Sequence, residues 1–230
     1  MKFKKWKKYG FEFVSIFLAV LSAFVLNNWN ENRKANESEN KILIEIANGL
    51  EKDILDIKQN KLGHKYGIDA CTYFRDLLAD KKVNTDSLLI YYRSLTRDFI
   101  SIQNTAGYET LKSRGLELIK NDSLRLQIIS LYAYNYDILR KLEEEYAEMQ
   151  FQENYFKEIT ASLAPNFIFD ENNVIAGIDF PLKIPIEQKK IVLLYLFKIE
   201  QNRKFIINYY AEVEKKVAEV EKQILMEIKA

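Results

Sequence analysis

The sequence "FVSIFLAVLSAFVL", residues 13–26, contains no charged side chain. It is shorter than the roughly 20 apolar residues of a typical transmembrane helix. Tryptophans flank it on both sides, at Trp6 and Trp29. At 1.5 Å per residue these two lie about 35 Å apart along a helix, which matches the spacing of the aromatic belts at the two membrane interfaces. We therefore predict a single transmembrane helix at residues 11–29.

Positive charge is concentrated before this helix. The first ten residues carry five lysines, whereas acidic and basic residues mix after Asn30. Basic residues favour the cytoplasmic side of a membrane. We expect residues 1–10 to be a cytoplasmic tail and residues 30–230 to lie outside. In a Gram-negative cell the protein would then be a single-pass protein of the inner membrane with a periplasmic body.

A cleaved signal peptide is the alternative reading, because such peptides also begin with lysines and a short apolar core. Signal peptidase requires small residues at its cleavage site. The residues that follow Leu26 are Asn27, Asn28, Trp29 and Asn30, which are polar or bulky. We therefore expect the anchor to be retained.

The composition limits what the body can be. Hydrophobic residues make up 48% of the chain, enough for a core, and the net charge is only +1. Without a basic excess in the body, we predict no nucleic-acid groove. A single cysteine, Cys71, rules out an intrachain disulfide. Only seven glycines and three prolines interrupt 230 residues, which favours helices.

Apolar residues recur every three or four positions along most of the body, the spacing of amphipathic helices. Such a stripe runs from Leu43 to Ile57 and resumes from Ala70 to Leu78, with a kink expected around "GHKYG", residues 63–67. Two short helices follow, the second ending at Gly115. The next two stripes predict helices over residues 121–163 and from Pro185 to Ile228. We therefore predict an all-α fold, in which the transmembrane helix precedes an elongated antiparallel bundle.

The segment at 163–185 lacks this spacing. It contains all three prolines and two apolar groups, "FIF" and "VIAGIDF". Irregular segments of this length are usually functional or flexible. It could form a β-hairpin or cover the end of the bundle, and a loop that docks a partner is the other interpretation.

Two stretches, "YGFEFVSIFLAVLSAFVLNNWNENRK" and "NTAGYETLKSRGLELIKNDSLRLQIISLY", resemble an uncharacterised family of single-pass membrane proteins from Bacteroidota. Members of that family usually read Gly-Glu-Ile before the apolar run and close it with Asn-Asn-Trp-Asn-Glu. Here Phe11 and Glu12 replace Gly-Glu, and the glycine stands one place earlier at Gly10. The resemblance implies an envelope protein, and it supplies no catalytic residues.

The anchor offers candidate contacts with the membrane or with a second copy. Glu12 lies at its cytoplasmic edge, where it could pair with Lys8 four residues earlier or form a ring in an oligomer. Small residues allow transmembrane helices to approach closely. The small residues considered are Ser15, Ala19, Ser22 and Ala23.

No arrangement of residues predicts an active site. His64 is the only histidine, and neither Cys71 nor the carboxylates stand at a spacing typical of zinc sites. Between two glycines, His64 is interpreted as a solvated residue at the kink, and Glu143, Glu144 and Glu145 as a solvated helix face. The tyrosines around Tyr134 are expected to fill the bundle, with a ligand cleft as the alternative. We predict no catalytic residue, cofactor or metal.

The leading functional hypothesis is a non-enzymatic scaffold or accessory subunit of a bacterial envelope complex. A ligand-sensing module that signals through a membrane partner is the alternative. The stretch "IVLLYLF", residues 191–197, is apolar on every face and calls for cover from a second copy or another envelope protein. The candidate partner contacts are Phe167, Phe169, Phe180, Leu194 and Leu196.

Overall fold

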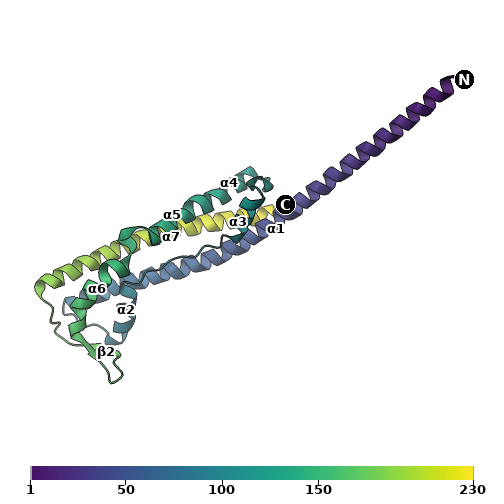
Figure 1. Cartoon of the computed structure of the whole chain (residues 1–230). Helices are drawn as coiled ribbons and strands as arrows, with labels where there is room; N and C mark the ends of the chain where they lie inside the picture. The colour runs from purple at the N-terminus through teal and green to yellow at the C-terminus, as the bar shows by residue number, and fades with distance from the viewer. Residues whose placement is uncertain (1, 230) are drawn as a thin grey trace.

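The computed structural model describes residues 2–229, and the side chains of residues 10–229. Helices account for 80% of the chain and strands for 3%, so the predicted all-α class is confirmed. The two longest elements are α1, Lys2–Leu78, and α7, Ile186–Glu227. They pack side by side in opposite directions, and α1 continues alone beyond the bundle toward the N-terminus (Figure 1).

Shorter elements complete the elongated antiparallel bundle. Helices α2 and α3 pack on α1, and the later segments line α7. The helices are α2 (Leu88–Leu95), α3 (Ala106–Arg114), α4 (Asp122–Ser130), a π-helix (Leu131–Asn135), α5 (Tyr136–Glu144) and α6 (Phe151–Leu163). Single 3-10 turns lie at Thr85–Ser87, Leu116–Leu118, Ala147–Met149 and Ala164–Asn166. The prediction of one unbroken helix over residues 121–163 is therefore wrong.

The break between α5 and α6 has a tertiary cause. The backbone N–H groups of Phe151 and Gln152 donate to the Asp98 carboxylate, at 2.8 and 3.4 Å. The side chain of Gln150 donates to the carbonyl of Glu143 at 2.8 Å. A helix can end and restart only where its free N–H and C=O groups find partners. Asp98 accepts from the N–H groups at the start of α6 from more than fifty residues away, and Gln150 donates to the Glu143 carbonyl near the end of α5. Apolar spacing could not reveal the distant partner.

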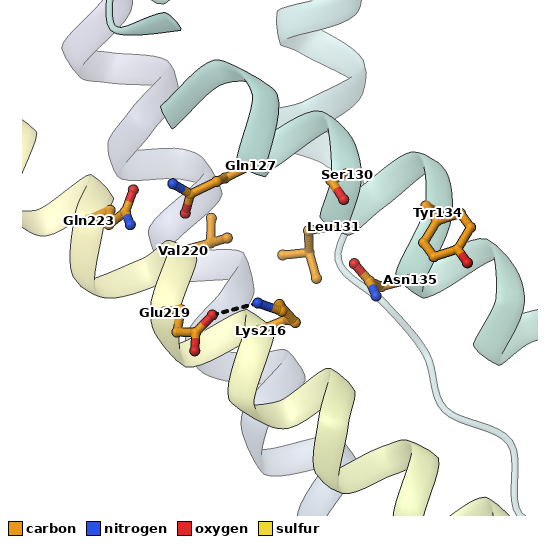
Figure 2. A pocket seen from close by; sticks show the side chains of 9 residues that line it. All are labelled: Gln127, Ser130, Leu131, Tyr134, Asn135, Lys216, Glu219, Val220 and Gln223. Atoms are coloured by element: carbon orange, nitrogen blue, oxygen red, sulfur yellow. Dashed lines mark hydrogen bonds and ion pairs between the residues drawn. The ribbon is translucent and has the colours of Figure 1, made fainter. Parts of the chain in front are cut away.

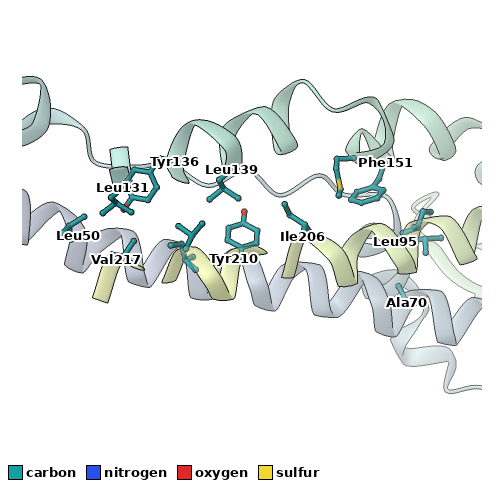
Figure 3. Close-up of a cluster of buried hydrophobic side chains, with 14 of the residues drawn as sticks. Leu50, Ala70, Leu95, Leu131, Tyr136, Leu139, Phe151, Ile206, Tyr210 and Val217 are labelled. Atoms are coloured by element: carbon teal, nitrogen blue, oxygen red, sulfur yellow. The ribbon is translucent and has the colours of Figure 1, made fainter. Parts of the chain in front are cut away.

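One apolar core runs along the bundle (Figure 3). Helix α7 buries a side chain at every third or fourth position from Val192 to Ile224. The α1 stripe from Leu43 onward faces it, and Leu139 and Phe151 close the core from α5 and α6. Each fully buried aliphatic side chain contributes about 1.5–3 kcal/mol of transfer free energy.

Several predicted boundaries are confirmed. Helix α1 ends at Leu78, and α3 ends before Gly115, whose φ of 102° suits glycine. Asn121 caps α4 by accepting a hydrogen bond from the Leu124 N–H at 3.2 Å. The irregular segment forms the β-hairpin that the sequence left open, with β1, Phe167–Phe169, antiparallel to β2, Ile175–Ile178.

Helix α1 continues through Gly63 and Gly67, so the helix is not interrupted where the sequence predicts a kink. The two glycines instead permit close packing. A Cβ on Gly63 would overlap the Phe99 ring, and one on Gly67 would overlap the Arg203 guanidinium. The two glycines of "GHKYG" therefore let the side chains of Phe99 and Arg203 pack directly against the α1 backbone.

The N-terminal part of α1 leaves the bundle. Every described side chain from Gly10 to Trp29 is exposed. Within the described residues, α1 is the one helix long and apolar enough to cross a membrane, and its apolar window is not buried by the rest of the chain. Burial inside a soluble core therefore does not explain this apolar surface.

Candidate functional site

Residues 96–105 connect α2 to α3 without helix or strand, yet they run along α1 in the middle of the bundle (Figure 1). We name this segment the strap. Thr96 and Ser101 in it are 3% and 7% exposed. Backbone groups that are shielded from water need hydrogen-bond partners, and the strap has no neighbouring strand to supply them.

Carboxylates of the bundle accept hydrogen bonds from the strap's backbone N–H groups. A buried carboxylate is stabilised by such bonds, which are stronger than those between neutral groups. The three pairs are Ser101 with Glu143 at 3.1 Å, Ile102 with Asp56 at 3.0 Å and Asn104 with Asp53 at 2.8 Å.

Arg203 on α7 holds carbonyl groups at the end of α2 and the start of the strap. Its side chain is fully buried, and its Nη2 donates to the carbonyls of Ser94, Leu95 and Arg97 at 3.3, 3.0 and 2.8 Å. The guanidinium carbon lies 4.3 Å from the centre of the Phe151 ring. Burial lowers the pKa of Arg203 to about 10, so it remains charged at neutral pH.

His64 lies beneath Arg203 and is 2% exposed, so its predicted solvation is wrong. Its Nδ1 is 3.0 Å from Nη1 of Arg203. Because arginine can only donate, Nδ1 must accept, which assigns the imidazole proton to Nε2. Burial, aided by the charge of Arg203, lowers the pKa of His64 to about 3. The imidazole is therefore neutral at physiological pH.

Glu143 is also buried, at 5% exposed, so the solvated face predicted for it is wrong. It accepts hydrogen bonds from the Tyr210 hydroxyl and from Ser101 Oγ, the latter at 3.0 Å. Burial raises the pKa of Glu143 to about 7, although these bonds oppose the rise. A cavity of about 10 Å³ lies between Glu143 and His64. It has room for about one water molecule.

Sequence reasoning missed this network, but a signal for it exists. Arg203 falls between Ile199 and Ile206 on the buried stripe of α7, and Asp53 falls between Leu50 and Ile57 on that of α1. A charged side chain at a stripe position must be paired when it is buried. The partners come from the strap, whose course the spacing of apolar residues does not predict.

A second feature is a groove with a volume of about 390 Å³, which lies between α7 and the segment formed by α4 and the π-helix (Figure 2). We name it the α4–α7 groove. One wall carries Gln127 and Ser130 from α4, with Tyr134 and Asn135 from the π-helix. π-Helical turns are rare and are frequent at functional sites. Tyr134 is 62% exposed.

The other wall of the groove belongs to α7. Lys216 and Glu219 form an ion pair at 2.9 Å, and Gln223 lies one turn further along. Leu131 and Val220, both buried, form the floor. The groove therefore combines neutral polar walls, a neutralised ion pair and an apolar floor.

The predicted partner contacts do not share one environment. Leu194, Phe169 and Phe180 are about half exposed, at 53%, 53% and 47%, whereas Phe167 packs partly against the core. Leu196 is fully buried, so its predicted role as a contact is wrong. Residues two positions apart on a helix face different directions, which explains the difference between Leu194 and Leu196.

The residues predicted to make contacts in the anchor all lie on the exposed N-terminal part of α1. Glu12, Ala19, Ser22 and Ala23 are exposed. Ser15 is exposed too, and its hydroxyl donates to the carbonyl of Phe11 at 2.9 Å. The predicted pair of Glu12 with Lys8 depends on a side chain outside the described residues.

Within residues 10–229 no group of three histidine, cysteine or carboxylate side chains is placed to hold a metal ion. The chain was also compared with known proteins. No protein-family model, curated protein or solved structure matches it. The function must therefore be inferred from the site geometry alone.

Proposed function

We propose that this protein is a membrane-anchored, non-enzymatic helical scaffold or accessory subunit of a bacterial envelope complex. The observation that carries the proposal is the continuity of α1 from Lys2 to Leu78. The apolar segment at residues 11–29 and the longest helix of the bundle are one rod. Such a rod holds the bundle at a set angle to the membrane without a flexible linker.

The bundle would place its far end well away from the membrane. Residues 36–78 of α1 span about 65 Å at 1.5 Å per residue. Near the anchor the bundle is closed by the Lys120 N–H, which donates to Glu39 at 2.8 Å, and by Asn121, which donates to Glu227 at 2.7 Å. The β-hairpin lies at the opposite end (Figure 1).

The role of the buried charges supports a scaffold. Asp53, Glu143 and the partly buried Asp56 accept hydrogen bonds from the strap's backbone, while Arg203 donates through Nη2 to backbone carbonyls and through Nη1 to His64. Groups engaged in this way stabilise a fold.

We expect residues 30–230 to be exported, with the N-terminus in the cytoplasm, because the five lysines precede the span. Protease added to spheroplasts of a Gram-negative host should digest the body and leave a short membrane-bound fragment. Intact cells, whose outer membrane excludes the protease, are the control. Protection of the body in spheroplasts would show the opposite topology, and a soluble full body in the periplasm would show cleavage.

The docking surface we propose is the outer face of α7 at Ile191, Leu194 and Phe197, which are 46%, 53% and 55% exposed. They lie on the side of α7 that faces away from the buried Val192 and Leu196. An apolar face of this kind is usually covered by a partner or a second copy.

Leu194→Glu should dissociate the complex without unfolding the bundle, because the side chain already contacts solvent. Light scattering of the full chain in detergent should give a mass above the 27.1 kDa monomer for the wild type and a lower mass for the variant. Leu62→Glu on α1 is the matched control, since Leu62 is 52% exposed. Equal masses for the two variants would reject this surface.

A further inference from the structure

We propose that the α4–α7 groove binds a neutral, polyhydroxylated ligand, that is, a saccharide. This activity goes beyond a scaffold role. The volume of about 390 Å³ falls in the range of small-molecule sites, about 300–1,000 Å³. The groove is open to solvent along one side, so a sugar attached to a longer chain could enter it.

The hydrogen-bonding groups of the groove are mostly neutral. Gln127, Asn135 and Gln223 carry amides, and Ser130 and Tyr134 carry hydroxyls. Each amide or hydroxyl can both donate and accept. Sugar hydroxyls have the same dual capacity, so one sugar ring can satisfy several of these groups at once. A carboxylate ligand can only accept hydrogen bonds and an ammonium ligand can only donate them, so either would pair with only the donors or only the acceptors of the groove.

The charges in the groove do not favour an ion. Lys216 and Glu219 neutralise each other at 2.9 Å (Figure 2). A charged ligand would have to compete with this pair, whereas a neutral ligand can accept from Lys216 and donate to Glu219 without breaking it. The groove therefore selects for a ligand without net charge.

Tyr134 supplies an apolar surface beside these polar groups. Tyr134 is 62% exposed and lies on the π-helix, next to Asn135. The neighbouring Tyr132 and Tyr136 are buried in the core. The aromatic face can pack against the C–H face of a sugar ring, while the hydroxyl remains available for hydrogen bonding. Tyr134, two positions from Tyr132 and from Tyr136, therefore faces outward while its neighbours fill the bundle.

The test uses the full chain in phosphatidylcholine nanodiscs, because common detergents carry sugar headgroups. Saturation-transfer NMR with cellobiose and N,N′-diacetylchitobiose should show transfer to the ring protons of one sugar face. Calorimetric titration should give a dissociation constant at or below the millimolar range. Glucuronate and glucosamine, which carry charges, should bind at least tenfold more weakly.

Two variants locate the site. Tyr134→Ala should weaken binding of the neutral disaccharide at least tenfold, and so should Ser130→Trp, which fills the groove. Tyr66→Ala is the matched control, because Tyr66 is 44% exposed on α1, outside the groove. The proposal is overturned if neither disaccharide binds at 10 mM, or if Tyr134→Ala and Tyr66→Ala bind equally well. Neither result bears on the docking surface at Leu194, which has its own test.

Discussion

Replacing Arg203 by methionine is expected to lower the thermal unfolding midpoint by about 10 °C. Methionine retains the apolar stem but cannot donate hydrogen bonds. The carbonyls of Ser94, Leu95 and Arg97 would then be left without the donor that now holds them. Each buried group that loses its partner costs about 1–3 kcal/mol.

The total loss in the free energy of unfolding of Arg203→Met should resemble that caused by removing one member of a buried ion pair, about 3–5 kcal/mol. For a domain of this size, 1 kcal/mol corresponds to about 2–4 °C. The midpoint can be followed by the helical circular dichroism signal in detergent. Arg203→Lys should be nearly as damaging, since one ammonium cannot reproduce the spread of guanidinium contacts.

Arg140→Met is the matched control. Arg140 on α5 is 43% exposed and pairs with Asp137 at 2.9 Å on the surface. Exposed ion pairs contribute little to stability, so its midpoint should stay close to that of the wild type. Similar midpoints for Arg203→Met and Arg140→Met would contradict the role of Arg203 in holding the strap.

The second large effect is a pair of opposing contributions to the pH dependence of stability, which replacement of His64 or Glu143 alone should reveal. The pKa of His64 is about 3 in the fold, against about 6.5 in an unfolded chain. Below pH 6.5 the unfolded chain therefore takes up a proton that the fold excludes. This histidine makes the protein less stable as pH falls from 6.5 toward 3.

Glu143 acts in the opposite direction. Its pKa is about 7 in the fold, against about 4.3 when unfolded. Between these values the folded protein holds a proton that the unfolded chain releases. The stability contributed by Glu143 is therefore complete below about pH 4.3 and is lost as pH rises through 7.

The two effects nearly cancel between about pH 4.5 and 6.5, since each has a slope of up to about 1.4 kcal/mol per pH unit with opposite sign. His64→Gln should expose the Glu143 slope, so that this variant becomes more stable by about 2 kcal/mol from pH 6.5 to 5. Glu143→Gln should lose about the same amount over that interval.

Unfolding midpoints at pH 5, 5.75 and 6.5 would measure both slopes. The double variant His64→Gln/Glu143→Gln corrects for other carboxyl groups, such as Asp56 and Asp98, whose pKa values burial also raises. Parallel profiles for the two single variants and the double variant would show that neither side chain titrates as described.

Local properties of the sequence determined much of this structure. The uncharged run at residues 13–26 marked the part of α1 that leaves the bundle, and apolar spacing located α7 almost to the residue. Gly115 and Asn121 marked helix ends because their backbone and side-chain preferences act within one turn. These signals depend on neighbours along the chain, so one sequence suffices to read them.

Which polar side chains are buried in the core was decided by tertiary structure alone. His64, Glu143 and Arg203 are polar residues whose burial depends on the strap, and the strap is placed by carboxylates and an arginine far from it in sequence. Asp98 likewise divides a continuous apolar pattern into α5 and α6. A charged side chain can be buried only where hydrogen-bonding partners lie within reach, and the position of those partners depends on packing between distant segments. For the same reason the α4–α7 groove, whose walls are about ninety residues apart in sequence, appears only in the folded chain.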